Sequence, residues 1–428
     1  DLVRSRGLGD VYKRQLLNRE FLRALGLAII IIGAPLGMYM NYFISNSSWS
    51  NILMLMGVLL IVSYRNLFEF KFPSYSKAFL GVIVFHLICF LSMQFTENFR
   101  YIHFHFFALA LMIALMSTRI NKLLNIDLIV RTVWILSLIC SFLFLFCIIT
   151  GIYAAQMRSL FAYQDGTNIL EPITMANVCS MNIISSFLVR ARNNWEKYVI
   201  ATAIILDFYC IFHTGKRSFF FIGFMSLFFY IWKYKLWSKI ISLNGVMFII
   251  ALVVGVSIVF FQNKEINEMA TRMWERFING INDMVTGSDT SGGSAVARYE
   301  QRQMIVDYIS TNFQWYNYLF GSGYFTFWSD LPYLQCYLDF GIYGFCTFMY
   351  YVFFLPLKTL WKVSTKNYML ICAAFICMPS TLQVFNSMHP YNYSNWTQVG
   401  FLLFVMANQK RITKLLKNSK KTIYGRKN

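Results

Sequence analysis

Long apolar runs, separated by short polar connections, follow one another along almost the whole chain. Runs of roughly 20 apolar residues, the length that crosses a bilayer as an α-helix, recur from Leu22 to Ala407. The pattern predicts an all-α integral membrane protein and differs from the short alternating segments of an outer-membrane barrel. The second and the last run are short, so a re-entrant or tilted helix is an alternative there. We expect about twelve transmembrane helices, at 22–44, 51–64, 77–95, 100–118, 127–150, 172–190, 197–214, 218–234, 243–262, 332–357, 367–386 and 397–408.

Lysine and arginine are concentrated in alternate connections between these runs. The connections at 45–50 and 387–396 have none, and two others have only Arg100 and Arg158. Because short cytoplasmic loops carry an excess of basic residues, the asymmetry predicts an even number of spans with both termini in the cytoplasm. The basic tail lies on that same side. The connections rich in basic residues carry Arg65, Lys71 and Lys77; Arg119 and Lys122; Arg190, Arg192 and Lys197; Lys233, Lys235 and Lys239; and Lys358, Lys362 and Lys366.

Composition supports a membrane protein and argues against a nucleic-acid partner. The chain is 57% hydrophobic and 13% charged, about half the charged fraction of a soluble domain. The net charge of +19 comes from short loops and the tail, so topology explains it better than nucleic-acid binding. The nine cysteines lie mostly in apolar runs and show no CxxC or Cys/His metal spacing. We therefore expect no disulfide, no metal site and no cofactor.

The chain divides into five segments. The string SRGLGDVYKRQ is the translation of a transposon tag used in sequencing libraries, so we expect residues 1–15 to be foreign to the protein. Nine spans then occupy 16–262, a large external loop containing short helices occupies 263–331, three spans occupy 332–408, and a basic cytoplasmic tail occupies 409–428. Within the loop, the stretch VARYEQRQMIVDYI predicts a helix. An apolar stripe from Ile266 to Met284 predicts another, either packed on the spans or lying at the membrane surface.

The short stretch HTGKRS, at 213–218, breaks the charge rule. Its Lys216 and Arg217 fall on the side that is otherwise poor in basic residues, as do Arg298 and Arg302 in the long loop. The last two are four residues apart and so share a helix face. The planar fork of arginine suits phosphate, so these residues predict an anionic ligand. The alternatives are a solvated, self-neutralising face formed with Glu300, and ordinary snorkelling of Lys216 and Arg217 at the interface.

The ordered combination of TGKRS, a large late loop with ARYEQR, and LFGSGYFTFWSDLPYLQCYLDFGIYG resembles the O-antigen polymerase and O-antigen ligase superfamily. The resemblance covers 172–360 in pattern and the remainder only in hydropathy. It implies a GT-C-like glycosyltransferase of the bacterial inner membrane. Such an enzyme transfers a glycan from polyprenyl diphosphate to an acceptor sugar hydroxyl on the external face, without metal or nucleotide sugar, and usually with inversion. Its partners would be the lipid-linked oligosaccharide, the bilayer, a chain-length regulator and a flippase.

The resemblance also assigns catalytic residues. Arg217, Arg298 and Arg302 would stabilise the departing diphosphate, with Lys216 as an additional point charge. Ligase members carry a His-Asn pair just before the YLQ stretch, and here Asp330 and a leucine stand in that place. Asp330 is therefore the candidate base, and the missing pair favours a polymerase over a ligase. The alternative for Asp330 is the N-cap of the tenth span, with a proline in the first helical turn.

Other polar residues are candidate substrate contacts or links between helices. Carboxylates inside spans are costly and often functional, as for Asp339 and Asp207. We expect Asp207 to pair with His86, His103 or His105, and Asn177 and Asn182 to bond neighbouring helices. A flippase or transporter is the alternative from another class, but we find no internal repeat of the kind transporters often show. The expected substrate-binding residues are Lys216, Tyr299, Glu300, Asp339, His389 and Glu171.

Overall fold

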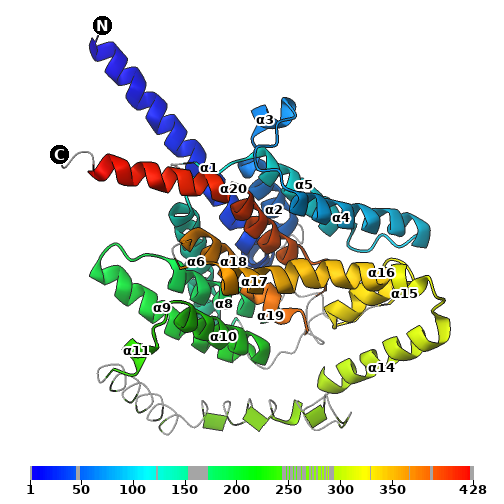
Figure 1. The fold of residues 1–428 in the computed structure, drawn as a ribbon. Helices are drawn as coiled ribbons and strands as arrows, with labels where there is room; N and C mark the ends of the chain where they lie inside the picture. The colour runs from blue at the N-terminus through cyan, green and yellow to red at the C-terminus, as the bar shows by residue number, and fades with distance from the viewer. Residues whose placement is uncertain are drawn as a thin grey trace.

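A computed structural model describes residues 2–44, 49–121, 124–152, 172–242, 294–327, 329–365, 367–385 and 389–424, with scattered positions between 247 and 288. In these parts every regular element is a helix and no strand is present (Figure 1). The helices are α1 (Leu2–Ile44), α2 (Trp49–Ile61), α3 (Tyr64–Phe68), α4 (Lys77–Thr96), α5 (Ile102–Ser117), α6 (Ile126–Ile149), α8 (Pro172–Leu188), α9 (Asn194–Thr214), α10 (Arg217–Lys233), α11 (Trp237–Ile240), α14 (Ser294–Asn312), α15 (Asn317–Phe320), α16 (Pro332–Phe348), a π-helical turn (Met349–Phe354), α17 (Leu355–Lys362), α18 (Tyr368–Ile376), α19 (Met378–Gln383) and α20 (Tyr393–Tyr424).

Several of these helices have the length and composition of membrane spans. Within the described parts, α4, α6, α9 and the continuous stretch Pro332–Lys362 qualify by length and hydropathy, and α1 adds a fifth if its bent halves form one span. That bend of 73° separates Arg19–Gly33 from Pro35–Asn41, where proline removes a helical hydrogen bond. The prediction of an all-α membrane protein is confirmed in this coarse form. The expected count of twelve stays a prediction, and shorter apolar helices occur at Trp49–Ile61, Ile102–Ser117, Pro172–Leu188 and Ser218–Lys233.

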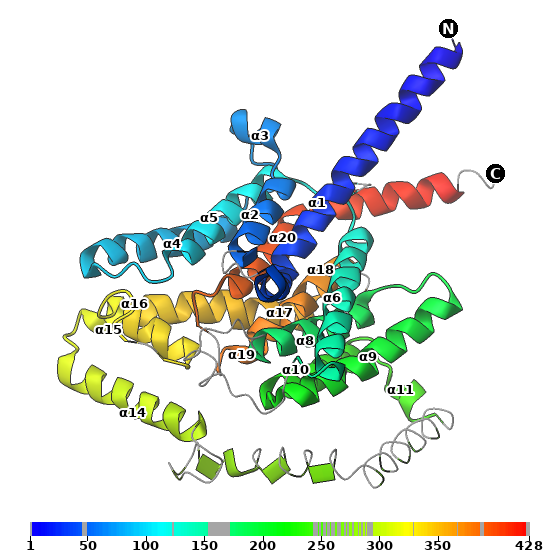
Figure 2. The ribbon, with the colours of Figure 1, turned by 180° about the vertical axis from the view of Figure 1, so that it is seen from behind.

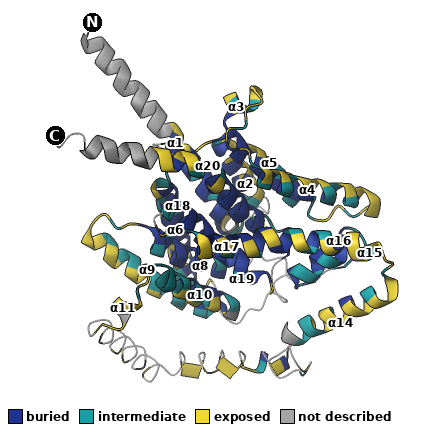
Figure 3. Ribbon diagram, in the orientation of Figure 1, coloured by how far each residue is buried: buried dark blue, intermediate teal, exposed yellow. Residues whose placement is uncertain are grey.

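The apolar side chains are distributed as a lipid environment requires. One stripe of α4 is buried in the core, including Phe79, Val82 and Phe85. The opposite stripe is exposed, with Leu91 at 60% and Phe95 at 87% of full accessibility (Figure 3). A water-soluble helix would carry polar residues on that exposed face. An outward apolar stripe on a long helix therefore fits contact with lipid chains.

The centre of the bundle is the N-terminal half of α20, which is buried by α5, α18 and α1 (Figures 1 and 2). Phe401, Leu402 and Phe404 are completely buried there. The α1–α2 pair packs closely because small residues face each other. A Cβ atom on Gly26 would lie 2.8 Å from the carbonyl oxygen of Gly57, the kind of close approach that glycine permits in membrane helices.

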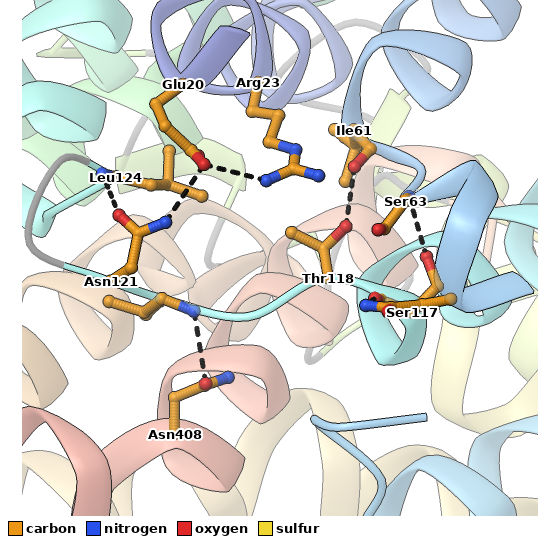
Figure 4. A network of polar contacts seen from close by, with 11 residues as sticks. Glu20, Arg23, Ile61, Ser63, Ser117, Thr118, Asn121, Leu124 and Asn408 are labelled. Atoms are coloured by element: carbon orange, nitrogen blue, oxygen red, sulfur yellow. Dashed lines mark hydrogen bonds and ion pairs between the residues drawn. The ribbon is translucent and has the colours of Figure 1, made fainter. Parts of the chain in front are cut away.

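Polar contacts hold the segment after α5 against three helices (Figure 4). Thr118 Oγ1 donates to the Ile61 carbonyl of α2 at 2.6 Å, and Asn121 donates to Glu20 of α1 at 3.0 Å. The Ile120 amide donates to Asn408 of α20 at 3.2 Å. The first bond satisfies a carbonyl group that the end of α2 leaves open. The three bonds connect α1, α2 and α20 near the place where both termini leave the bundle (Figure 1).

Helices α14, α15 and α16 form the corner of the fold in which the candidate site lies. Inside α16 the backbone kinks at Phe340 and Gly341, and Gly341 has a φ of 59°. The kink frees helical carbonyl groups, and the amides of Ser322 and Gly323 donate to the carbonyls of Leu338 and Asp339 at 2.8 and 3.1 Å. The GSG turn after α15 therefore replaces hydrogen bonds that the kinked helix lacks.

Candidate functional site

Three connections that the loop charges assign to the same face meet in the structure. They are 97–101 between α4 and α5, 321–331 before α16, and 389–392 before α20. The Tyr324 hydroxyl donates to the Arg100 carbonyl at 2.8 Å, and the Tyr391 hydroxyl donates to Asp339 Oδ2 at 2.6 Å. The convergence of the three connections defines the end of the bundle on which the candidate residues lie. The assignment of this face to the outside of the membrane stays a prediction.

Arg298 lies on α14, the helix that the VARYEQRQMIVDYI stretch predicts. Its side chain is partly buried, and its Nε atom is buried without a hydrogen-bond partner in the described parts of the chain. Burial lowers the pKa of the guanidinium, and the nearby carboxylate of Asp330 opposes this shift. A partly desolvated arginine with an unused donor is suited to bind an anion, because desolvation strengthens the electrostatic attraction.

Asp330 lies beside Arg298 through a contact between α14 and the start of α16. The backbone amide of Asp330 donates to Gln301 Oε1 at 2.9 Å, and Gln301 is three residues after Arg298 on α14. The interpretation of Asp330 as an N-cap is wrong, because the N-cap residue of α16 is Leu331 and its side chain caps nothing. Pro332 does stand in the first turn, as expected. Asp330 is thus held by its backbone, beside the Arg298 cation.

The other candidates on α14 differ from Arg298 in exposure. Arg302 and Glu300 are exposed, and Tyr299 is partly buried. Arg302 follows Arg298 by one helical turn, so both can reach the same side of α14. Ring contacts fix the far end of this helix, since Tyr308 lies 5.5 Å from Phe327 and Phe313 lies 6.3 Å from Tyr337 between ring centroids. The arginine-bearing half of α14 mixes partly buried and exposed residues, and the other half is mostly exposed (Figure 3).

The HTGKRS stretch forms a tight turn between α9 and α10. Gly215 ends α9 with a φ of 64°, a conformation that favours glycine. The Lys216 amide donates to Thr214 Oγ1 at 3.2 Å, and Lys216 is the N-cap residue of α10. Arg217 begins α10, and its side chain lies outside the described residues. In both views α14 lies apart from the α9–α10 pair (Figures 1 and 2). A meeting of Arg217 with Arg298 and Arg302 therefore stays a prediction.

Asp339 is the centre of a buried hydrogen-bond network. It is completely buried, and Gln335 Nε2 donates to both of its carboxylate oxygens at 2.9 and 3.0 Å. The Tyr391 hydroxyl and the Thr326 amide also donate to it, at 2.6 and 3.3 Å. These donors come from α16, the 321–327 turn and the segment before α20. The expected contact of Asp339 with substrate stays a prediction.

Histidines and tyrosines surround this network. His86 Nδ1 lies 2.9 Å from His105 Nδ1, and His105 Nε2 lies 3.2 Å from the Tyr324 hydroxyl. Because that hydroxyl donates to the Arg100 carbonyl, it accepts from His105, which fixes the proton of a neutral His105 on Nε2. His389 is buried against the rings of Tyr101 and Tyr391, at centroid distances of 5.1 and 4.9 Å. The cluster packs aromatic rings densely beneath the three connections that meet here.

One expectation for a polar residue, Asp207, is wrong, and another, Glu171, concerns a residue outside the described parts of the chain. Asp207 does not bond to a histidine in the described parts, because its Oδ2 accepts from Asn182 at 2.7 Å while His86 and His105 bond to each other. Asn182 therefore does join neighbouring helices, as expected. Glu171 lies outside the described residues, as does most of the apolar stripe at 266–284.

Sequence reasoning missed the residues that hold the site in place. Gln301 and Tyr391 are the main examples, because each bonds to a residue more than twenty positions away. The only available signal for Tyr391 was its position in a polar connection rich in aromatic residues. No family model matches this sequence, and a search of curated proteins found no similar sequence.

Proposed function

We propose that this protein polymerises lipid-linked oligosaccharide repeat units on the external face of the bacterial inner membrane. The donor is a glycan on polyprenyl diphosphate, and the acceptor is a sugar hydroxyl of a second lipid-linked unit. The observation that carries the proposal is the Arg298–Asp330 arrangement, a partly buried arginine whose Nε has no hydrogen-bond partner among the described residues, beside a carboxylate. The resemblance in 172–360 supplies the substrate class, and the apolar helices fit a lipid-linked donor.

The reaction requires two groups of opposite character close together. The acceptor oxygen attacks the anomeric carbon, its proton passes to Asp330, and the bond to the diphosphate breaks with its electron pair on the leaving oxygen. Arginine stabilises the charge that develops on the diphosphate. Arg298 takes this role, with Arg302 one turn away and with Arg217 and Lys216 on the α9–α10 turn. A carboxylate within hydrogen-bond reach of the acceptor hydroxyl can accept its proton.

The proposal is tested in a host that makes the glycan, with the polymer resolved by length on a gel. The variant carries Arg217→Ala, Arg298→Ala and Arg302→Ala together, and Arg192→Ala is the matched control because Arg192 is exposed on a connection assigned to the opposite face. We expect the variant to leave single repeat units on the final acceptor while the control keeps the normal ladder. A normal ladder from the triple variant contradicts the proposal. Polymer retained on the lipid carrier would instead indicate the ligase reaction.

A further inference from the structure

Two apolar helices end side by side at the face that the loop charges assign to the cytoplasm. The apolar part of α10 runs to Lys233, and the candidate span that contains α16 and α17 ends at Lys362. The rings of Trp232 and Trp361 lie 5.1 Å apart between centroids. The Lys233 ammonium group donates to the Leu360 carbonyl, which is one of those that the end of a helix leaves open. The two contacts hold these helix ends at one level.

Lysines are concentrated at these two helix ends. Lys235 is exposed in the turn after α10, and Lys358 and Lys362 are exposed on α17. The last two are four residues apart and so share one face of α17. Together with the residues of the contact they form one surface, which we call the lysine–tryptophan surface. Its members are Lys233, Lys235, Lys358, Lys362, Trp232 and Trp361.

The positive charge of this surface is not neutralised by acidic residues. The stretches 217–240 and 349–366 contain neither Asp nor Glu. Within the described parts of the chain, none of the four lysines forms an ion pair. Basic residues of α6 and of the α8–α9 connection do have acidic partners, since Arg131 pairs with Glu196 and Arg190 lies 4.0 Å from Asp127. The lysine–tryptophan surface therefore suits an anionic partner.

The backbone at Lys235 gives a separate reason to expect a role for its side chain. Helix α10 ends in a Schellman motif, in which the Leu236 amide donates to the Ile231 carbonyl at 2.9 Å and the Lys235 amide donates to the Trp232 carbonyl at 3.2 Å. Lys235 has a φ of 52°. Glycine is favoured at this position, because a Cβ atom is strained at positive φ. A lysine costs stability here, so the needs of the turn do not explain its presence.

We propose that the lysine–tryptophan surface binds the phosphate headgroup of an anionic phospholipid. Basic residues at the ends of membrane helices attract anionic lipid headgroups, and tryptophan is enriched at the level of these headgroups. The ring of Trp361 is 72% exposed, so it is free to contact the lipid while the lysines bind the phosphate. A water-soluble acidic partner would match the lysines but not their position at the ends of two apolar helices. This inference does not depend on the proposed function, because it concerns lipid binding alone.

The test uses the whole protein purified in detergent. Native mass spectrometry measures its affinity for phosphatidylglycerol, which is anionic, and for phosphatidylcholine, which is zwitterionic, with the same oleoyl chains in both lipids. We expect the wild type to bind phosphatidylglycerol more tightly. The variant that carries Lys235→Gln, Lys358→Gln and Lys362→Gln together should lose at least about tenfold in affinity for phosphatidylglycerol and keep its affinity for phosphatidylcholine.

The matched control removes three other lysines that the loop charges assign to the same face. It carries Lys77→Gln on α4 with Lys410→Gln and Lys414→Gln on α20, where all three side chains are exposed and the last two are also four residues apart. The control loses the same charge as the triple variant. We expect it to bind phosphatidylglycerol as the wild type does.

Lys235→Gly separates lipid binding from folding. Glycine relieves the positive φ, so the unfolding midpoint without added lipid should stay the same or rise, while the affinity for phosphatidylglycerol falls about fivefold. Three outcomes would overturn the proposal: equal affinity of the wild type for the two lipids, unchanged affinity in the triple variant, or an equal loss in the control. If the triple variant does not fold, unchanged affinity in Lys235→Gly refutes the site.

Discussion

The hydroxyl group of Tyr391 lies 2.6 Å from Asp339 Oδ2, although 52 positions separate the two residues. Both side chains are completely buried. Asp339 belongs to α16, directly before its kink, and Tyr391 belongs to the segment that leads into α20. This short bond therefore connects α16, which begins two residues after the candidate base Asp330, with the segment that leads into α20.

Replacing Tyr391 with phenylalanine should destabilise the protein without changing its packing volume. A buried carboxylate oxygen would lose a donor, which costs about 1–3 kcal/mol. The unfolding midpoint in detergent measures the effect. The matched control is Tyr350→Phe, because Tyr350 is 44% exposed on the π-helical turn that follows α16. Equal midpoints for the two variants would show that the Tyr391–Asp339 bond contributes no stability.

Alanine at Gly321 should cost far more than alanine at Gly151, a glycine with a similar φ. A Cβ atom on Gly321 would lie 2.3 Å from the Asp339 carbonyl group, and its φ is 77°. Gly151 has a φ of 73°, and no described residue lies within 4 Å of its Cβ position. Gly151→Ala therefore carries only the strain of a positive φ, about 1–2 kcal/mol. Gly321→Ala adds a backbone clash.

The folded fraction recovered by size-exclusion chromatography compares the two glycine variants. We expect Gly151→Ala to elute as the wild type does and Gly321→Ala to aggregate. Similar elution of both variants would mean that the turn and the kinked helix can separate without loss of the fold.

The sequence predicted those features that depend on residues close to one another along the chain. The periodicity around Arg298 predicts α14, and Pro332 marks the first turn of α16. The contact of Gly321 with the kink was not predictable, because it depends on how a turn docks on a helix rather than on either segment alone. The expected partner of Asp207 was wrong for the same reason, since helix periodicity says which face is buried but not which helix lies opposite. The unused Nε of Arg298 also appears only once α14 is packed.

Replacing Gln301 with alanine should weaken the proposed reaction more than it weakens the fold. Gln301 Oε1 accepts from the Asp330 amide at 2.9 Å and so sets the position of Asp330 relative to Arg298. Loss of a neutral hydrogen bond costs about 1 kcal/mol, whereas a small displacement of catalytic groups reduces rates by up to about 100-fold. Gln303→Ala is the control, because Gln303 is exposed two positions further along α14.

Polymer length in the host and the unfolding midpoint in detergent distinguish the two effects for Gln301. We expect Gln301→Ala to give a shortened ladder with a midpoint close to that of the control. A normal ladder would indicate that the Gln301–Asp330 bond has no part in positioning the base.

His389 should make the stability of the protein depend on pH. Burial lowers its pKa to about 3, while the unfolded chain has a value near 6.5. The unfolded state then binds more protons between these two values, so the stabilising contribution is complete above about pH 6.5 and falls as the pH drops towards 3. The groups facing it are the rings of Tyr101, Phe325 and Tyr391, and His105 is a nearby titratable group.

His389→Gln removes this titration and keeps a polar side chain of similar size. Between pH 7.5 and 5.0 we expect the unfolding midpoint of the wild type to fall further than that of His389→Gln, by at least about 3 °C. His213→Gln is the control, because His213 lies in the last turn of α9 and is only partly buried. A buried neutral histidine destabilises the fold only when it becomes protonated. If the unfolding midpoints of the wild type and of His389→Gln fall equally, the pH dependence therefore arises from other groups.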